Sequence, residues 1–437
     1  MKNNKKIIII AAAVVLMAAA VVMMLSWDFN GKNGETTKTT TTEKPTTIQN
    51  PTGTTTAEPT TTSEPTTTPE PTTTAEPTTT NQFYTGPTTT ADRLDDFDDS
   101  KVKALYLTAS SASGAKLNDI INLVNTTELN ALVIDVKDWY VYYDSDIPMI
   151  NEFKLDNPFY DPAAIAKKLH DIGIYAIARL VVFKDNNLTK VRPDLAIKTK
   201  DGKIWLENGN TGWTNPYIEE VWDYNIAIAK EVIAAGFDEV QFDYVRFPSG
   251  TLGVVEYGAE MPAKSDAICG FLEKAAKEIH AMGAKVSADI FGIVLESDLD
   301  GRNIGQELLK VGMNVDYVSP MIYPSHYAND SNGAMGNGVG TKISGITYTK
   351  PDLEPYSLVK ATLLNTKVKL AAVDGYRADV RPFLQAFTAD YLREGYYQVY
   401  GPTQIREQIQ AVYDAGYTSW ILWSAANIYP AGAFLTK

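Results

Sequence analysis

The chain has 437 residues, of which 44% are hydrophobic and 21% charged, with a formal net charge of −14 and a single cysteine. This length can form one large domain or two ordinary ones. The acidic balance argues against nucleic acid or anionic lipid as a partner of the folded part, and one cysteine excludes an internal disulfide.

Residues 1–27 are typical of a membrane anchor. Three lysines within the first six residues precede an unbroken apolar run over 7–25, which is close to the ~20 residues that cross a bilayer. Because lysines stay on the cytoplasmic side, we expect a single-pass membrane protein with its amino terminus in the cytoplasm and the rest outside. The small residues at 18–20 leave a cleaved signal peptide, and hence secretion, as the alternative.

Residues 28–94 have a different composition. A Glu-Pro-Thr-Thr-Thr unit recurs from Glu58, Glu64, Glu70 and Glu76, and almost nothing apolar is present to form a core. Proline keeps such a polar chain extended. We therefore predict a disordered linker rich in threonine, proline and glutamate, which holds a globular domain over 95–437 away from the membrane.

The globular part alternates short apolar runs with amphipathic stretches. The runs have the near-continuous apolar character of strands buried on both faces, and they lie at 102–109, 131–138, 174–183, 239–247, 285–291, 316–323, 380–387 and 419–425. Helices are predicted between them at 116–129, 162–172, 216–235, 264–282, 303–312, 353–372 and 402–415. This alternation predicts an α/β fold, a (β/α)8 TIM barrel. A doubly wound open sheet is the alternative, but no glycine-rich nucleotide turn follows the first strand.

Two of the predicted connections, 184–214 and 324–352, are long. They follow the third and sixth strands, so in a barrel both would lie at the carboxyl end of the strands. Long loops in compact domains usually line a site or close over it.

Polar and aromatic side chains gather at the carboxyl ends of the predicted strands, where TIM-barrel enzymes have their active sites. Charged groups are rarely buried without partners, so a ring of them at one end of a barrel indicates a function. The candidate substrate-binding residues are Asp135, Lys137, Asp138, Trp139, Arg179, Lys184, Tyr244, Arg246, Tyr323, His326, Gln385, Trp423 and Asn427.

Two carboxylates on neighbouring strands, Asp243 and Asp289, suit glycoside hydrolysis. One would be a nucleophile or base, and the other a proton donor with a raised pKa. Arg179 or Arg246 beside Asp243 would keep Asp243 ionised. A plainer interpretation is that Asp243 and Arg246 pair with each other only to hold a loop.

The sequence lacks the motifs of metal-dependent and serine hydrolases. The three histidines, His170, His280 and His326, lie on different elements and none has metal-ligand spacing. There is no nucleophile elbow and no phosphate-binding loop. We therefore expect no metal ion and no cofactor.

Seven ordered blocks resemble a bacterial family catalogued as glycosyl hydrolases of unknown function. The blocks are 132–138, 178–185, 241–248, 286–292, 319–327, 381–387 and 420–423, and the likeness spans about 101–430. The resemblance implies a TIM-barrel fold that is distantly similar to the alpha-amylase clan. That resemblance implies Asp243 as the nucleophile and Asp289 as the acid, with Glu296 as a substitute because the clan's acid is normally glutamate. The clan's third carboxylate, on strand 7, corresponds here to Gln385.

These observations together predict an exported, membrane-anchored glycoside hydrolase that acts on a cell-wall or environmental polysaccharide with two carboxylates. The alternative is a barrel at the cell surface that binds carbohydrate without cutting it.

Overall fold

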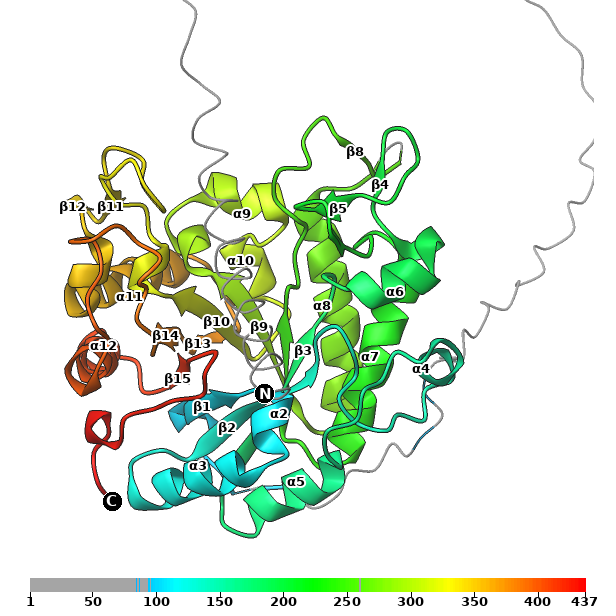
Figure 1. Cartoon of the computed structure of the whole chain (residues 1–437), viewed down its shortest axis with the longest axis horizontal. Coiled ribbons are helices and arrows are strands. Elements are labelled where there is room, and N and C mark those ends of the chain that lie inside the picture. The colour runs from blue at the N-terminus through cyan, green and yellow to red at the C-terminus, as the bar shows by residue number, and fades with distance from the viewer. Residues whose placement is uncertain (1–83, 85, 87–92, 95, 259–260) are drawn as a thin grey trace, which may run out of the picture.

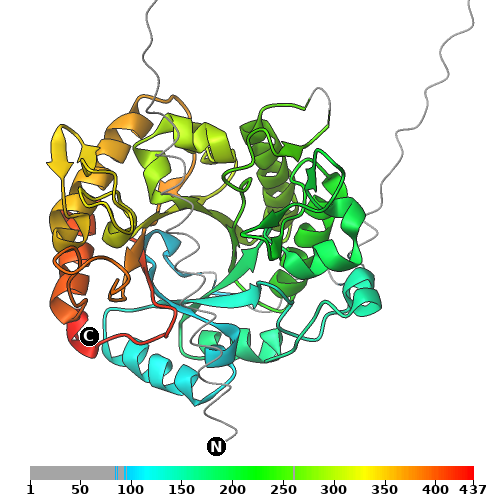
Figure 2. The same cartoon turned by 45° about the horizontal axis from the view of Figure 1, so that its top comes forward.

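The computed structural model describes residues 84, 86, 93, 94, 96–258 and 261–437. They form a closed ring of parallel strands surrounded by helices (Figure 1, Figure 2). The ring follows the order β1 (Lys103–Leu107), β2 (Ala131–Lys137), β3 (Tyr175–Val181), β7 (Glu239–Asp243), β9 (Lys285–Phe291), β10 (Tyr317–Ile322), β14 (Phe383–Gln385) with the short β13 (Asp379–Val380), and β15 (Trp420–Trp423). Pairing of β15 with β1 closes the ring, which confirms the predicted barrel and excludes the open sheet.

The helices cover the outside of the ring. The longer ones are α3 (Ala115–Thr126), α5 (Pro162–His170), α7 (Glu219–Ala234), α8 (Lys264–Ala281), α11 (Pro355–Ala371) and α12 (Pro402–Asp414). The shorter ones are α2 (Ala109–Ala112), α4 (Pro148–Phe153), α6 (Asn186–Val191), α9 (Asp298–Ile304) and α10 (Leu308–Val311). Single 3-10 turns are η1 (Asp99–Lys101), η2 (Pro193–Leu195), η3 (Gly292–Leu295), η4 (Pro324–His326), η5 (Pro351–Leu353) and η6 (Ala431–Ala433).

Three predicted elements differ from the structure. The single helix expected at 303–312 is wrong: α9 ends at Ile304, before Gly305 with its φ of 80°, and α10 starts separately. The strand expected at 380–387 is interrupted between β13 and β14, where Pro382 has no N–H to donate. The strand expected at 239–247 ends at Asp243, because the next residue, Tyr244, adopts a φ of 49°.

Side chains of each strand alternate between two cores. On β1, Leu105 and Leu107 belong to the large apolar layer between the strands and the helices. Ala104 and Tyr106 belong to a smaller cluster inside the barrel. Full burial of both faces explains why the strands read as continuous apolar runs.

The amino-terminal end of the barrel interior contains a fully buried ion pair. Arg381 Nη1 donates to both carboxylate oxygens of Glu239 at 2.8 Å, and both side chains are 0% exposed. Arg381 Nε donates to Ser419 Oγ at 3.0 Å, while Ser287 Oγ donates to Glu239 Oε1 at 2.5 Å. The guanidinium also lies 3.6 Å from the centre of the Tyr317 ring. Three strands of the ring, β7, β9 and β10, and the segments that lead into β14 and β15 thus meet at one charged pair.

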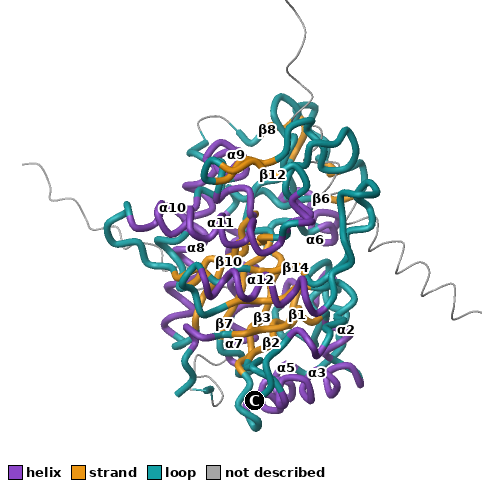
Figure 3. Tube along the Cα trace, turned by 90° about the vertical axis from the view of Figure 1, so that its left-hand side faces the viewer, coloured by secondary structure: helices purple, strands orange, loops and turns teal. Residues whose placement is uncertain are grey.

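The carboxyl end of the barrel has the longer loops. Two-stranded sheets within them pair β4 (Lys198–Thr199) with β8 (Val255–Glu256), β5 (Leu206–Glu207) with β6 (Thr211–Gly212), and β11 (Thr341–Ile343) with β12 (Ile346–Tyr348). These sheets follow β3, β7 and β10, and they lie toward one end of the barrel (Figure 3). The long loops predicted at 184–214 and 324–352 therefore do share one face.

The predicted anchor at 1–27 and most of the predicted linker at 28–94 lie outside the described residues. Across the part of the chain that is described, no helix has the length and apolar character needed to cross a membrane.

Candidate active site

Arg179 on β3 binds two carboxylates on the strands that flank it. Its Nη1 donates to Asp135 Oδ1 on β2 at 2.6 Å, and its Nε and Nη2 donate to Asp243 Oδ2 on β7 at 3.0 and 2.5 Å. Tyr106 OH on β1 donates to the other oxygen of Asp135 at 2.5 Å. All of these side chains are buried.

Strand register brings this group together. Asp135 lies directly opposite Arg179, and Arg179 lies opposite Gln241, two residues before Asp243. Side chains two residues apart on a strand share a face. Asp135, Arg179 and Asp243 therefore all point into the barrel at its carboxyl end.

Asp289 on β9 is the second carboxyl of the predicted catalytic pair, and its environment is different. The register pairs Phe242 with Ala288, so Asp289 is the strand neighbour of Asp243. Asp289 is 1% exposed, and its Oδ1 has no hydrogen-bond partner among the described residues. Burial, followed by the nearby charge of Asp243, raises the pKa of Asp289 well above its ordinary value. This environment favours the protonated form of Asp289.

Raising the pH is expected to destabilise the wild-type domain relative to an Asp289→Asn variant. The pKa of Asp289 is raised in the folded protein. At pH values above ~3.9, the pKa of an aspartate in the unfolded chain, the folded protein therefore binds more protons than the unfolded chain. The stability contributed by the protonated carboxyl is present below that value, and it is lost as the pH rises through the folded pKa. The free energies of unfolding of the two proteins should diverge by up to about 1.4 kcal/mol per pH unit in this window. Urea unfolding at about pH 5 and about pH 8 measures the difference, and parallel curves would contradict the expectation.

Asp138 lies where β2 opens into the mouth of the barrel. An irregularity of register between Asp135 and Lys137 precedes it. Burial, with a further contribution from the Asp135 carboxylate, raises the pKa of Asp138 to about 6. The next two residues, Trp139 and Tyr140, are 39% and 37% exposed, so this loop presents two aromatic rings to solvent beside a partly buried acid.

Tyr244 follows Asp243 in a strained conformation. Its φ of 49° costs a non-glycine residue on the order of 1–3 kcal/mol. The backbone N–H of Tyr244 donates to Asp243 Oδ1 at 2.6 Å, so the turn helps to orient the carboxylate. The plainer interpretation of this segment, a pair between Asp243 and Arg246, is wrong because Arg179 is the cation that binds Asp243.

Aromatic residues form the opposite side of the mouth. Tyr106, Trp423, Tyr323, Phe387 and His326 contact one another with ring centroids 5.2–6.0 Å apart. Burial lowers the pKa of His326 to about 4, so this imidazole is neutral near pH 7. One half of the mouth is therefore charged, on β2, β3, β7 and β9, and the other half is aromatic.

Two predicted site residues face away from this group. Lys137 is 1% exposed, and its Nζ pairs with Asp185 at 2.9 Å and donates to the carbonyl of Val181 at 2.7 Å. Glu296 accepts a hydrogen bond from Asn365 of α11 at 2.7 Å. The structure thus places Glu296 against the outer helix layer, and of the two candidate partners of Asp243 only Asp289 is its neighbour.

Gln385 and Asn427 are buried with their polar groups bonded to protein. Gln385 Nε2 donates to Asp352 Oδ1 at 2.9 Å, and its Oε1 accepts from the backbone of Ser325 at 3.1 Å. Asn427 Oδ1 accepts from Thr108 Oγ1 at 3.0 Å. Both side chains connect loops beneath the mouth.

Residues 104–429 match the model of a family described as "Putative glycosyl hydrolase domain". The chain belongs to this family. Among solved structures, the glycoside hydrolase domain of PgaB (BpsB) from Bordetella bronchiseptica has a TM-score of 0.52 at 12% identity, covering 77% of this chain and 99% of its own. That likeness supports the shared fold.

Two further structures are similar. A hypothetical protein from Ruminiclostridium thermocellum is 39% identical over 42% of this chain and 96% of its own, with a TM-score of 0.40. The spore cortex-lytic enzyme SleL of Bacillus megaterium is 13% identical, covering 76% of this chain and 72% of its own, with a TM-score of 0.43. No curated protein matches the chain.

Some residues at the mouth of the glycosyl hydrolase domain were not predicted from the sequence. Tyr106 binds Asp135, and its alternation with the inward-facing Ala104 could have identified it. Phe387 lies beyond the end of β14, where no periodicity indicates its direction.

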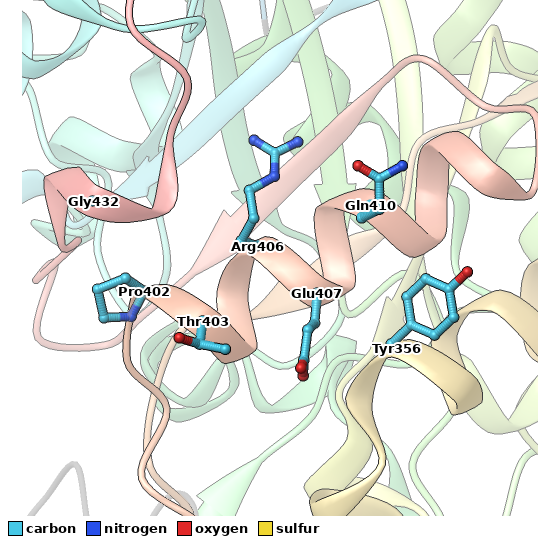
Figure 4. Close-up of a pocket in the computed structure, with 7 residues that line it drawn as sticks. All are labelled: Tyr356, Pro402, Thr403, Arg406, Glu407, Gln410 and Gly432. Atoms are coloured by element: carbon cyan, nitrogen blue, oxygen red, sulfur yellow. The ribbon is translucent and has the colours of Figure 1, made fainter.

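A hollow of about 440 Å³ also lies on the outer surface of the glycosyl hydrolase domain (Figure 4). It is lined by Tyr356, Pro402, Thr403, Arg406, Glu407, Gln410 and Gly432. These residues belong to α11, α12 and a terminal turn, and none of them belongs to the groups at the strand ends.

Proposed function

We propose that this domain hydrolyses glycosidic bonds of a cell-wall or environmental polysaccharide by a two-carboxylate mechanism. The observation that carries the proposal is the contrast between two neighbouring carboxyls. Asp243 is in an ion pair with Arg179, while burial favours the protonated form of Asp289. A carboxylate held by a cation, next to a carboxyl whose burial raises its pKa, is the arrangement expected of a base or nucleophile and an acid in glycosidases.

In the proposed reaction, Asp289 donates its proton to the glycosidic oxygen as the bond to the anomeric carbon breaks. The Asp243 carboxylate either attacks that carbon or takes a proton from the attacking water. Arg179 orients Asp243, and Asp135 shares the positive charge of Arg179. The aromatic half of the mouth offers ring faces on which the apolar faces of sugars can stack.

An Asp289→Asn variant tests the role of the proton donor. Turnover of a natural glycan is expected to fall by about 10²–10⁴-fold, because asparagine has no acidic proton to donate. An aryl glycoside of the same sugar with a dinitrophenol leaving group needs no protonation, so its cleavage should fall far less. Equal losses on both substrates would contradict the assignment.

The function itself is tested by incubating residues 95–437 with a panel of polysaccharides and measuring released reducing ends. Proton NMR of the first product then shows whether the anomeric configuration is retained or inverted. A complete absence of release across neutral and acidic glycans would count against hydrolysis.

A barrel that binds carbohydrate without cutting it is the second candidate. One observation favours it: Arg179 binds both Asp135 and Asp243, which restrains each carboxylate. Glycan binding by wild type with no reducing ends released, and unchanged binding by an Asp243→Asn variant, would identify this function.

We also propose that residues 1–27 anchor the protein in the cell membrane with the barrel outside, carried on the linker over 28–94. The apolar run at 7–25 supports this placement. Fractionation of the full-length protein distinguishes an anchor, found in the membrane pellet with an intact amino terminus, from a cleaved signal peptide with the barrel in the medium.

A further inference from the structure

Arg246 is a buried cation whose positive charge is not balanced by an ion pair. Its side chain is 3% exposed. Its Nη1 donates to the carbonyl of Phe247 at 3.0 Å, and its Nε has no hydrogen-bond partner among the described residues. Within that same part of the chain, no carboxylate lies at ion-pair distance from the guanidinium. Buried guanidinium groups are normally paired with a carboxylate.

Three aromatic rings enclose this guanidinium. Its central carbon lies 4.8 Å from the ring centre of Trp213, 5.2 Å from Tyr244 and 4.5 Å from Phe291. Each cation–π contact contributes on the order of 0.5–2 kcal/mol, while removing an ion from water costs several kcal/mol. Burial accordingly lowers the pKa of Arg246. The rings orient the guanidinium, and an anion would offset the remaining cost.

The acidic residues near Arg246 are each paired with another cation. Glu207 has the largest acidic influence on Arg246, but its carboxylate is 2.8 Å from Lys184 Nζ. Lys184 itself lies 4.9 Å from the ring centre of Tyr244. Asp243, three residues before Arg246, also attracts the guanidinium, but its ion-pair partner is Arg179. Lys184, Glu207 and Arg246 together carry one net positive charge.

We propose that Arg246 is the anion-binding residue of a substrate subsite, and that the glycan cleaved by this barrel carries a carboxylate or phosphate group near the scissile bond. This inference rests on the proposed function and narrows its substrate class to acidic polysaccharides. A planar guanidinium binds both kinds of anion through two parallel N–H donors. Because the chain has a net charge of −14, long-range attraction does not favour a polyanion, and the preference comes from this contact.

The test measures binding of matched polymers to residues 95–437 carrying Asp243→Asn, which keeps the polymer uncut. Polygalacturonate and hyaluronan are each compared with their carboxyl-reduced forms, and phosphomannan with its dephosphorylated form. In at least one pair the anionic member is expected to bind about tenfold or more tightly, which is about 1.4 kcal/mol. The carboxylate and phosphate pairs distinguish the two sources of negative charge.

Arg246→Met should reduce that affinity ratio to nearly one, because the apolar stem remains and the charge is lost. Arg246→Gln carries the same expectation if the methionine variant unfolds at a lower temperature. Lys167→Met removes an exposed charge from α5 and should leave the ratio unchanged.

Three results would each overturn the inference. They are equal binding of the two polymers within every pair, no binding to any polymer, and an unchanged affinity ratio in the folded Arg246 variants. Its failure is separable from that of hydrolysis, because reducing ends released by the wild-type domain are measured independently. Tighter binding of the anionic polymer with no reducing ends released would support the anion subsite and contradict the hydrolase function. Released reducing ends with no preference for the anionic polymer would support hydrolysis and contradict the anion subsite.

Discussion

Replacing Asp243 with asparagine is expected to lower turnover of the cleaved polysaccharide by at least about a thousandfold, which is about 4 kcal/mol of transition-state stabilisation. Asparagine has nearly the same shape, but it can neither form a bond to the anomeric carbon nor accept a proton from water. The measurement is the rate of reducing-end release by the purified domain at saturating substrate.

Two controls accompany that experiment. Thermal unfolding shows whether Asp243→Asn folds, since the variant leaves Arg179 with Asp135 as its remaining carboxylate partner. Glu296→Gln alters a carboxylate bonded to Asn365 of α11, and its turnover should stay within a few-fold of wild type. Undiminished release by a folded Asp243→Asn domain would remove Asp243 from the mechanism.

Breaking the ion pair at the opposite end of the barrel is expected to have the largest effect on stability. Arg381→Met or Glu239→Gln should each lower the free energy of unfolding by about 3–5 kcal/mol. Both side chains are 0% exposed, so either change leaves a polar partner buried without its counterion. Urea denaturation of residues 95–437 provides the measurement.

The double variant Glu239→Gln/Arg381→Met should lose much less than the sum of the single losses, because no unpaired charge remains. An exposed ion pair offers a matched comparison: Lys167→Ala on α5 and Asp171→Ala just after it should each leave the unfolding curve unchanged. Small, additive losses at Glu239 and Arg381 would show that the buried pair is not a major source of stability.

The strands and their order were largely predictable from local patterns. Apolar runs about seven residues long, separated by helices, identify a parallel barrel because only strands buried on both faces lack polar positions. The errors occurred where one residue decides the outcome. The left-handed backbone of Gly305 divides a predicted helix, and Pro382 interrupts a predicted strand. Tyr244 was unpredictable, because a tyrosine in the left-handed region is stabilised by contacts that form only in the folded chain.

The sequence by itself determined which strands carry charge at their carboxyl ends, since a side chain's place along a strand follows from the apolar pattern. It identified Asp243, Asp289 and Arg179 as members of one face. Only the tertiary structure decided which of these groups pair. Strand register across the ring placed Arg179 opposite Asp135 and two residues along from Asp243 on β7, and it placed Asp289 beside Asp243. The η3 turn after β9 directed Glu296, only seven residues after Asp289, toward α11 and away from the other catalytic candidates. Pairing depends on neighbours brought together by ring closure, and no local sequence pattern encodes that geometry.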